Sequence, residues 1–454
     1  MQDLRSFLER IAGHVTRVSR PAPLDAIAAL CGQSPGPILF EQIEDHPGWR
    51  LCDIFFKTRA LQALTMGTTP ENVLRWMGQK LAEGPLPAVV VPTGPVKEIR
   101  LTGQDADMTR LPVPVHSADD IGPYIAAMSC LKDPDTGIQN TAIVRTLVGG
   151  PRHGVSSYVT RHSIELCRRY RELRRPMPQA IVIGVHPLVE LASCYSGRHE
   201  SWSELDLAGR LLGEPLELVP CETIDLMVPA HAEVVIEGYI YPDRLDVDGP
   251  SPSPNCLLVP RAQQMPVFEV TAITMRHNPI YRHFQAVPFT DHQPLPRLFH
   301  QAILFQRLTE AGYKVHDVVY PPWGAVNTCI VQMTPAHEGQ AVDAMLMLMG
   351  APWPHAKIAI AVDEDIDPHS AEDVFWAIAT RVDPSRQVNM INGARGYAAD
   401  PAATLLHPDF PFRISGKMAI DATKPPAYRP NRQDFKRSWP ARWDEVRLKD
   451  FLGD

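Results

Sequence analysis

The sequence predicts a mixed α+β and α/β chain, in which a β-rich middle lies between two α/β parts. Three observations lead to this prediction. The length of 454 residues exceeds that of one ordinary core, so roughly two or three domains are expected. Apolar residues make up 44% of the chain and charged residues 21%, which is typical of a globular protein. The hydrophobic pattern also changes twice along the chain, from helix–strand alternation to short β-branched runs and back.

The first part, residues 1–104, combines helical and strand patterns. Residues 3–12 and 70–82 have the apolar spacing of amphipathic helices, and short apolar runs such as PILFEQI and PAVVVP accompany them. This combination predicts a small N-terminal α/β domain.

The middle part, residues 105–297, is dominated by strand patterns. Turn residues separate β-branched runs such as TAIVRTLVGG, AIVIGV, AEVVIEGYIYP and PVFEVTAITMR. Two helices are expected within it, near residues 164–175 and 201–212. This part should therefore form a mainly β domain.

In the third part, residues 298–424, helices and strands alternate again. Examples are QAILFQRLTEAGY, DVVYPP, GQAVDAMLMLMG and AKIAIAVDEDID. A second α/β domain is predicted here. The remaining tail, residues 425–454, is rich in proline and contains tryptophan, and we expect it to pack on a neighbour.

Charge and cysteine usage exclude several classes of protein. The net charge of −8 and the absence of a long basic stripe argue against nucleic-acid binding. The eight cysteines are scattered without a C-x-x-C pair, which is typical of reduced structural thiols. No apolar run reaches the roughly 18 residues of a membrane span, and the acid-containing N-terminus is unlike a signal peptide. A cytoplasmic protein without a membrane segment is predicted.

Familiar catalytic motifs such as G-x-G-x-x-G, the P-loop, G-x-S-x-G and H-E-x-x-H are absent. Three features of the middle part nevertheless carry polar groups suited to chemistry: the run from Asn140 to Arg145, the pair Arg161-His162 at an expected strand end, and Glu204 at the start of an expected helix. An amide oxygen, an imidazole nitrogen and a carboxylate oxygen suit Mn²⁺ or Mg²⁺ better than zinc. Composition alone favours ordinary structural roles for each of them.

The spacing of Asn140 and Arg145 has a structural consequence. An offset of five places two side chains on opposite faces of a regular strand. If both residues serve one site, a bulge or a strand end should intervene between them.

At these residues the sequence resembles the UbiD family of prenylated-FMN-dependent (de)carboxylases. The family pattern of Asn, four residues, Arg, and a later His fits Asn140, Arg145 and His162. The helix Glu that precedes an L-E-L-V-x-C-E-T stretch fits Glu204 and LELVPCETIDLMVPAHAEVVIEG at 216–238. KIAIAVDEDID, DVFWAIATRVDP and SGKMAIDATKP resemble the C-terminal signatures, so the similarity runs over most of the chain.

The resemblance implies a fold and an activity. The fold would comprise an N-terminal α/β domain, a central split-β-barrel flavin-binding domain and a C-terminal α/β oligomerisation domain. The activity would be the non-oxidative, reversible decarboxylation of an aromatic, heteroaromatic or α,β-unsaturated carboxylic acid, with prenylated FMN as the electron sink. A flavin prenyltransferase would supply the cofactor, and the chain would form a homodimer or a homohexamer.

The resemblance also implies roles for individual residues. Asn140, His162 and Glu204 would hold Mn²⁺ or Mg²⁺ at the cofactor phosphate, with K⁺ nearby. Arg145 would fix the substrate carboxylate or tune the flavin. The full set of residues implied to line the cofactor is Asn140, Thr141, Ala142, Ile143, Val144, Arg145, Arg161, His162, Glu204 and Lys417, of which Lys417 would reach the phosphate.

One stretch departs from the family pattern of Glu-Gly-Pro-Phe-Gly-Glu. Here it reads Asp248-Gly-Pro-Ser-Pro-Ser253, so that the first acid is kept as Asp248 and the second, the proton donor, is replaced by Ser253. A hydroxyl group is too weak an acid to replace a carboxyl group directly, although it could relay a proton through water.

Three interpretations of this departure remain open. Another side chain could supply the proton, and His277 is preferred because imidazole transfers protons near neutral pH. The intermediate could instead take a proton from solvent, or the protein could bind the cofactor without rapid turnover. The full set of candidate donors is Glu269, His277, His283, Asp291 and His292.

Two other classes of function are kept as alternatives. A noncatalytic prenylated-flavin-binding subunit of a larger carboxylase would explain the loss of the second acid. A split-barrel flavin oxidoreductase would need a nicotinamide site, and the sequence has no dinucleotide fingerprint.

Overall fold

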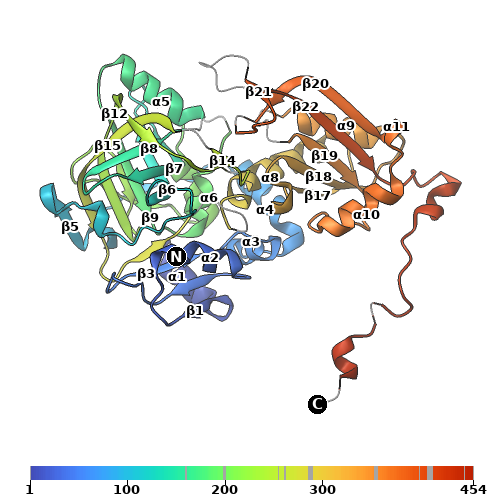
Figure 1. Cartoon of the computed structure of the whole chain (residues 1–454), viewed down its shortest axis with the longest axis horizontal. Coiled ribbons are helices and arrows are strands. Elements are labelled where there is room, and N and C mark those ends of the chain that lie inside the picture. Colours follow the sequence, from blue (N-terminus) through green and yellow to red (C-terminus); the bar gives the residue numbers. More distant parts are fainter. Residues whose placement is uncertain are drawn as a thin grey trace. The chain divides into compact units, whose positions relative to one another are not determined.

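The computed structural model describes residues 2–158, 161–197, 201–253, 255–259, 262–284, 290–351, 356–397, 399–405, 413–443 and 445–452. The chain divides into two compact units (Figure 1). Unit 1 contains residues 1–306, 320–327 and 398–402, and unit 2 contains residues 307–319, 328–397 and 403–454. The division of the sequence into four parts stays a prediction.

Unit 1 begins with a small α/β layer whose sheet takes one strand from far along the chain. Its four strands follow the order β1-β2-β3-β16, and β16 pairs in parallel with β3 so that Arg282 lies opposite Cys52. The predicted helices near residues 3–12 and 70–82 are confirmed by α1 and α4. The elements are α1 (Leu4–Arg10), β1 (Thr16–Val18), α2 (Leu24–Gln33), β2 (Ile38–Phe40), β3 (Arg50–Asp53), α3 (Arg59–Met66), α4 (Val73–Ala82) and β16 (Ile280–Arg282).

The middle of the chain forms a closed barrel of six antiparallel strands, which confirms the predicted β-rich domain. The strands follow the order β12-β9-β6-β7-β8-β15, and pairing of β12 with β15 closes the ring. A further strand, β5 (Ile99–Thr102), pairs with β15 outside the ring. The barrel strands are β6 (Tyr124–Lys132), β7 (Gln139–Val148), β8 (His153–Ser157), β9 (Met177–Ile183), β12 (Val234–Asp248) and β15 (Gln263–Met275).

Alternating side chains fill the barrel, as the two-residue period of a strand requires. Val144 of β7, Ile236 of β12 and Phe268 of β15 are all at most 2% exposed and belong to one apolar core. This core fixes the register of β7 and so fixes which of its side chains face away from the barrel interior.

Short strands and helices surround the barrel. The helices predicted near residues 164–175 and 201–212 are confirmed as α5 and α7. Ser203 and Asp206 form a capping box that starts α7, and Gly213, with a φ of +82°, ends it. The elements are β4 (Val89–Val90), α5 (Arg161–Glu172), α6 (Pro187–Ala192), α7 (Glu204–Leu212), β10 (Glu217–Pro220), β11 (Met227–Pro229), β13 (Ser251–Pro252), β14 (Leu258–Val259) and α8 (Pro294–Glu310).

Two local predictions are wrong. β7 pairs with β6 without interruption from Gln139 to Leu147, so no bulge separates Asn140 from Arg145. Arg161 and His162 begin α5 and do not lie at a strand end, because β8 has already ended at Ser157.

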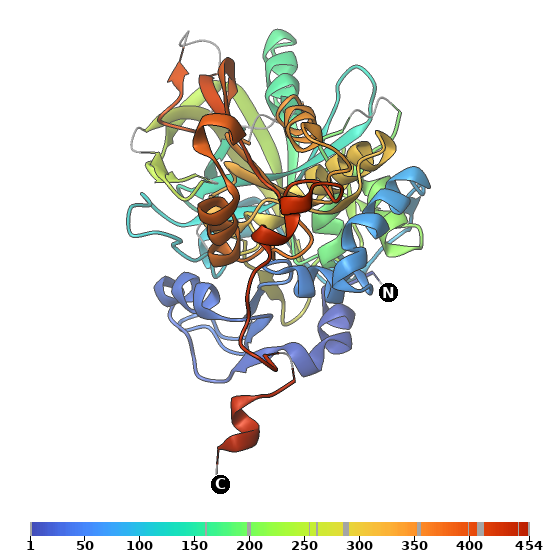
Figure 2. The same cartoon turned by 90° about the vertical axis from the view of Figure 1, so that its right-hand side faces the viewer.

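Unit 2 contains a mixed sheet in the order β17-β18-β19-β22-β20, which confirms the predicted second α/β fold (Figure 2). The three central strands are parallel, and α9 and α10 pack against them. The elements are β17 (Val315–Val319), β18 (Thr328–Met333), α9 (Gln340–Met349), β19 (Ile358–Val362), α10 (Ala371–Arg381), α11 (Pro384–Gln387), β20 (Val388–Gly396), β21 (Thr404–Leu405) and β22 (Arg413–Ala422).

In the described part of the tail after β22, the regular elements are two short 3-10 turns, η7 (Pro430–Phe435) and η8 (Leu448–Phe451) (Figure 1). Among the helices in the described ranges, none is both long and apolar enough to cross a membrane.

Candidate active site

Asn140 and Glu204, two of the three predicted metal ligands, are in direct contact. The carboxylate of Glu204 accepts a hydrogen bond from Asn140 Nδ2 at 2.9 Å and from the backbone N–H of Thr141 at 2.8 Å. This contact is possible because β8 pairs only with the second half of β7, from Arg145 to Val148. The first turn of α7 therefore covers the first half of β7, and Glu204 is 1% exposed there.

The oxygen atoms beside Glu204 fit a hard divalent cation. Asn140 Oδ1 and Thr141 Oγ1 are buried and have no hydrogen-bond partner in the described part of the chain. A buried amide oxygen without a partner is costly, and an amide oxygen beside a carboxylate is a donor set that Mn²⁺ and Mg²⁺ accept. His162, the third predicted ligand, is partly buried at the second position of α5. The side chain of Arg161 lies outside the described part, and the roles of both residues stay predictions.

Arg145, five residues along β7, forms a second polar site with the end of β12. Its guanidinium donates to Asp248 Oδ2 at 2.7 Å and to Ser251 Oγ at 2.5 Å, and it lies 4.8 Å from the centre of the Tyr124 ring. The Tyr124 hydroxyl also donates to Asp248 Oδ1 at 2.9 Å, and burial followed by the charge of Asp248 raises the pKa of Tyr124. Arg145 Nε is buried and has no hydrogen-bond partner among the described residues. Asp248 and Ser251 thus hold the guanidinium in place while other N–H donors of the group remain without a partner within the described ranges.

The serine that contacts Arg145 is Ser251, which the sequence analysis missed. Ser253 turns into its own loop, where its hydroxyl contacts Asn255 Oδ1 and donates to the carbonyl oxygen of Leu257 at 2.8 Å. A tight turn at Gly249, with a φ of +89°, brings Ser251 back toward the guanidinium that holds Asp248. The Asp-Gly-Pro-Ser sequence was the available signal for this turn.

Two histidines, His116 and His292, lie within electrostatic range of Arg145, and a third, His283, packs against His116. The rings of His116 and His283 meet edge to face at a centroid distance of 5.0 Å. Burial, followed by the charge of His283, lowers the pKa of His116 well below its usual range, and burial, followed by the charge of Arg297, lowers the pKa of His292 to about 3. The positive charge of Arg145 contributes to both shifts, so both imidazoles lie within its electrostatic range.

His283 contacts a buried cluster of charged residues, here called the Arg282 cage, which consists of Arg282 and the three carboxylates around it. Arg282 is 2% exposed and pairs with three carboxylates: with Asp53, with Glu190 at 3.0 Å and with Asp291 at 2.7 Å. His283 Nδ1 lies 2.9 Å from Asp53 Oδ2. Three acids surround one arginine, and burial accordingly raises the pKa of Glu190 to about 7 despite the opposing charge of Arg282. Glu190 therefore exchanges a proton near neutral pH.

Cys31, Asp53 and His283 form the one group of His, Cys and acidic residues in the described ranges whose side-chain atoms are close enough for a metal, all within 4.8 Å. Metal binding would need a thiolate, yet burial followed by the charge of Asp53 raises the pKa of the Cys31 thiol well above its usual range. Asp53 is already paired with Arg282. The chemistry of this group therefore argues against metal binding.

The structure does not bring His277 to Arg145. His277 is exposed in the turn after β15, where its backbone N–H donates to the Glu98 carboxylate at 2.6 Å. In the β12–β15 ladder, Val234 pairs with Met275 at the end near His277, whereas Asp248 pairs with Gln263 at the other end. β15 has 13 residues, so the two ends are separated by roughly 40 Å along the strand.

The remaining predicted residues lie in other surroundings. Glu269 is paired with Arg244 on the barrel surface at 3.2 Å. Lys417 is buried on β22 in unit 2 and donates to the carbonyl oxygen of Met349 at 2.8 Å. Burial, followed by the charge of Arg395, lowers the pKa of Lys417. Its predicted role at the cofactor phosphate stays a prediction.

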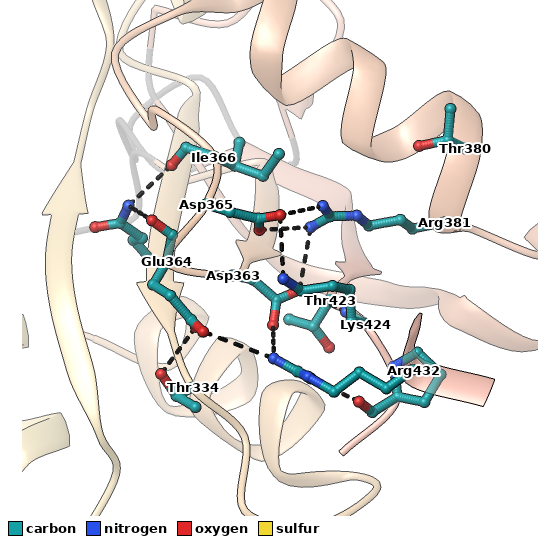
Figure 3. Close-up of polar contacts among 12 residues, drawn as sticks. Thr334, Asp363, Glu364, Asp365, Ile366, Thr380, Arg381, Thr423, Lys424 and Arg432 are labelled. Atoms are coloured by element: carbon teal, nitrogen blue, oxygen red, sulfur yellow. Dashed lines mark hydrogen bonds and ion pairs between the residues drawn. The ribbon is translucent and has the colours of Figure 1, made fainter. Parts of the chain in front are cut away.

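The acidic run after β19 is neutralised by cations. Figure 3 shows Arg381 facing Asp363 and Asp365, at 3.1 Å and 2.8 Å. Lys424 lies 3.1 Å from Asp365, and Arg432 of η7 lies 3.3 Å from Asp363 (Figure 3). This network joins the start of the tail to the end of β19 and is a structural anchor within unit 2.

Comparison with known proteins identifies the family. One family model, the 3-octaprenyl-4-hydroxybenzoate carboxy-lyase Rift-related domain of UbiD, matches residues 88–288, and the C-terminal domain of the same carboxy-lyase matches residues 295–422. Together these matches cover more than half of the chain. The chain therefore belongs to the UbiD family.

Solved structures and a curated relative agree with this assignment. The chain is 33% identical to the UbiD-class enzyme HmfF from Pelotomaculum thermopropionicum in complex with FMN, with a TM-score of 0.88 and complete coverage of both chains. An evolved dimeric form of that enzyme with prFMN is 32% identical at a TM-score of 0.85, covering 99% of this chain and 100% of that one. An uncharacterized protein of Archaeoglobus fulgidus is 31% identical over an alignment of 326 residues that covers 68% of this chain. The match spans 63% of that relative's own length.

Proposed function

We propose that the protein is a carboxy-lyase that releases CO₂, reversibly and without net oxidation, from an aromatic, heteroaromatic or α,β-unsaturated carboxylic acid. One observation carries the proposal. A single barrel strand, β7, presents a buried amide–carboxylate pair at Asn140 and, at Arg145, a partly buried arginine paired with the buried Asp248. Membership of a family described as carboxy-lyases, and the flavin complexes of the related enzyme HmfF, support it.

Prenylated FMN is the proposed cofactor, with Mn²⁺ or Mg²⁺ at its phosphate and K⁺ nearby. Asn140 and Glu204 would hold the divalent metal together with His162, because their buried oxygens form a suitable set. Residues 140–145 and Arg161 would line the flavin, and Lys417 would contact its phosphate. When bound, the prenylated flavin supplies the sink for the electron pair that the departing CO₂ leaves behind.

The residues of the chain bind and orient the acid. Arg145 is held by Asp248 and Ser251, so that its remaining Nε donor points in a fixed direction toward a substrate carboxylate. Asp248 is 1% exposed, and the burial around it limits the access of water to the reacting carbon. The carbon that loses CO₂ must then gain a proton, for which Ser253 is poorly placed because its hydroxyl is engaged in its own loop.

A noncatalytic flavin-binding subunit is the second candidate function. The missing second acid at Ser253 favours it, because a subunit that only binds the cofactor needs no proton donor. A split-barrel flavin oxidoreductase is the third candidate and would require a nicotinamide site.

We also propose that the chain assembles with further copies of itself as a homodimer or homohexamer, and that a flavin prenyltransferase supplies its cofactor. The tail supports self-assembly, because it exposes large apolar side chains that water solvates poorly. They are Trp439, Trp443, Leu448, Phe451 and Leu452, which are 51% to 77% exposed. Truncation after Lys436 should lower the number of chains per particle, as determined from the mass in light scattering. An unchanged number of chains per particle would exclude the tail from the interface.

The experiment that separates the three functions uses the purified full chain loaded with prenylated FMN and Mn²⁺. It is incubated with a panel of aromatic, heteroaromatic and acrylic acids in deuterated buffer. A carboxy-lyase releases CO₂ and places deuterium on the carbon that carried the carboxylate. No CO₂ release and no exchange with any acid would favour the noncatalytic subunit, and consumption of NADH would favour the oxidoreductase.

A further inference from the structure

The contacts of His283 differ at its two ring nitrogens. Nδ1 is fixed by Asp53 at 2.9 Å, whereas Nε2 is buried and has no hydrogen-bond partner among the described residues. The backbone N–H of His283 donates to the carbonyl oxygen of Cys52 at 2.9 Å, and the residue is 1% exposed. A carboxylate that holds one nitrogen of an imidazole fixes the tautomer and leaves the other nitrogen for proton transfer.

His116 links the surroundings of His283 to those of Arg145. The ring of His116 packs edge to face on His283, and the pKa of His116 is lowered by burial, then by His283, and further by Arg145. Among the described residues, His116 makes no side-chain hydrogen bond. His116 therefore packs against His283 and also lies within electrostatic range of the guanidinium that would bind the substrate carboxylate.

Titratable and charged groups from several elements surround His283. The titratable and charged groups packed around it are Cys31 of α2, Cys52 and Asp53 of β3, His116 before β6, and Arg282 of β16. Burial alone would raise the pKa of Asp53, but Arg282 and His283 hold it below its usual range. Asp53 thus stays ionised beside the imidazole, and beyond Arg282 the Glu190 carboxyl group takes up or releases a proton near neutral pH.

We infer that His283 is the proton donor of the proposed decarboxylation, with Asp53 as its positioning residue; this inference rests on the proposed function. After CO₂ has left, the Nε2–H bond of His283 breaks and a C–H bond forms at the carbon that carried the carboxylate. The electron pair of the broken C–C bond, returned from its sink, becomes the new C–H bond. Nε2 keeps the electron pair of its N–H bond, and it regains a proton from water before the next turnover.

The first test uses the wild-type chain and therefore does not depend on the folding of a variant. Ring ¹⁵N shifts of His283 are followed by NMR from about pH 5 to 9, beside the pH profile of turnover on an acid that the panel identifies. The turnover rate should fall with rising pH through the same pKa at which Nε2 loses its proton. An active enzyme in which His283 keeps one protonation state over this range overturns the inference alone. An inactive wild type overturns the proposed function and the inference with it.

The second test uses His283→Asn, which keeps a donor at the place of Nδ1 for Asp53 but removes Nε2. The turnover rate should fall about a hundredfold, the lower end of general-acid effects, while flavin and metal content stay unchanged. His14→Asn, an exposed histidine outside the site, is the matched control and should be fully active.

Asp53→Asn should lower the turnover rate less than His283→Asn does. It should also displace the pH profile of turnover, as a positioning role requires. Full activity of folded His283→Asn, or a hundredfold loss in His277→Asn with His283→Asn intact, would overturn the inference.

Discussion

Replacing Arg145 with lysine keeps the positive charge but removes the planar guanidinium and its several directed N–H donors. The guanidinium donates to two partners at once, Asp248 at 2.7 Å and Ser251 at 2.5 Å, and lies over the Tyr124 ring. An ammonium group can keep the contact with Asp248 but cannot reproduce the second directed bond or the free Nε donor. One lost hydrogen bond to a charged group is worth about 1.5–3 kcal/mol. If this loss falls on the transition state, kcat/KM drops roughly 10- to 150-fold.

The assay for Arg145→Lys is steady-state decarboxylation together with urea unfolding. Asp248 keeps a cation and the Tyr124 hydroxyl, so the free energy of unfolding should fall by less than about 1.5 kcal/mol. Arg244→Lys is the matched control, because Arg244 also lies over a tyrosine ring, at 4.6 Å from that of Tyr241, and pairs with an acid, but on the surface. Unchanged kinetics of a well-folded Arg145→Lys, or an equal loss in the control, would refute the assigned role.

Three further predictions concern buried acids and their partners. Glu204→Gln keeps the size of the side chain but removes its charge, so the purified variant should lose both metal and flavin in metal analysis and absorbance; full retention of both would exclude Glu204 as a ligand. Arg282→Met leaves three carboxylates without their cation, so the free energy of unfolding should fall by about 3–5 kcal/mol. Urea unfolding measures this change, and the surface substitution Arg244→Met should lower the same free energy by under about 1 kcal/mol. The pKa of Glu190 rises from 4.5 to about 7 on folding, so the folded state binds more protons than the unfolded state between these values. The free energy of unfolding of the wild type should therefore contain a contribution of about 3 kcal/mol that is present below pH 4.5 and is lost as the pH rises through 7. Glu190→Gln should lack this contribution. If the free energy of unfolding depends on pH in the same way in wild type and variant, the raised pKa is contradicted.

Much of the fold and part of the site could be predicted from the sequence. The β-branched runs predicted the barrel, because alternation along a strand records which side chains fill its interior. The resemblance to the UbiD family implied that Asn140 and Glu204 share one metal site, and the structure brings these two residues together. The retained acid Asp248 likewise lies against Arg145, as the family pattern implied.

The rest depended on long-range contacts that leave no local signal. β16 pairs with β3 across more than two hundred residues, and only this pairing places His283 beside Asp53 and encloses Arg282. His277 was the preferred donor because imidazole transfers protons near neutral pH, but it lies after the end of β15 that is far from Asp248. The bulge expected in β7 is absent, since the two polar residues serve partners on different elements, α7 and the end of β12. The roles of both polar sites in catalysis stay predictions.

The most direct test of the central claim is the position of the metal. Crystals of the full chain grown with Mn²⁺ and prenylated FMN would be measured at the manganese absorption edge. We predict one anomalous peak per chain, within bonding distance of both Asn140 Oδ1 and a carboxylate oxygen of Glu204. A flavin-loaded crystal with no peak there, or with its peak at Cys31, Asp53 and His283, would contradict the account.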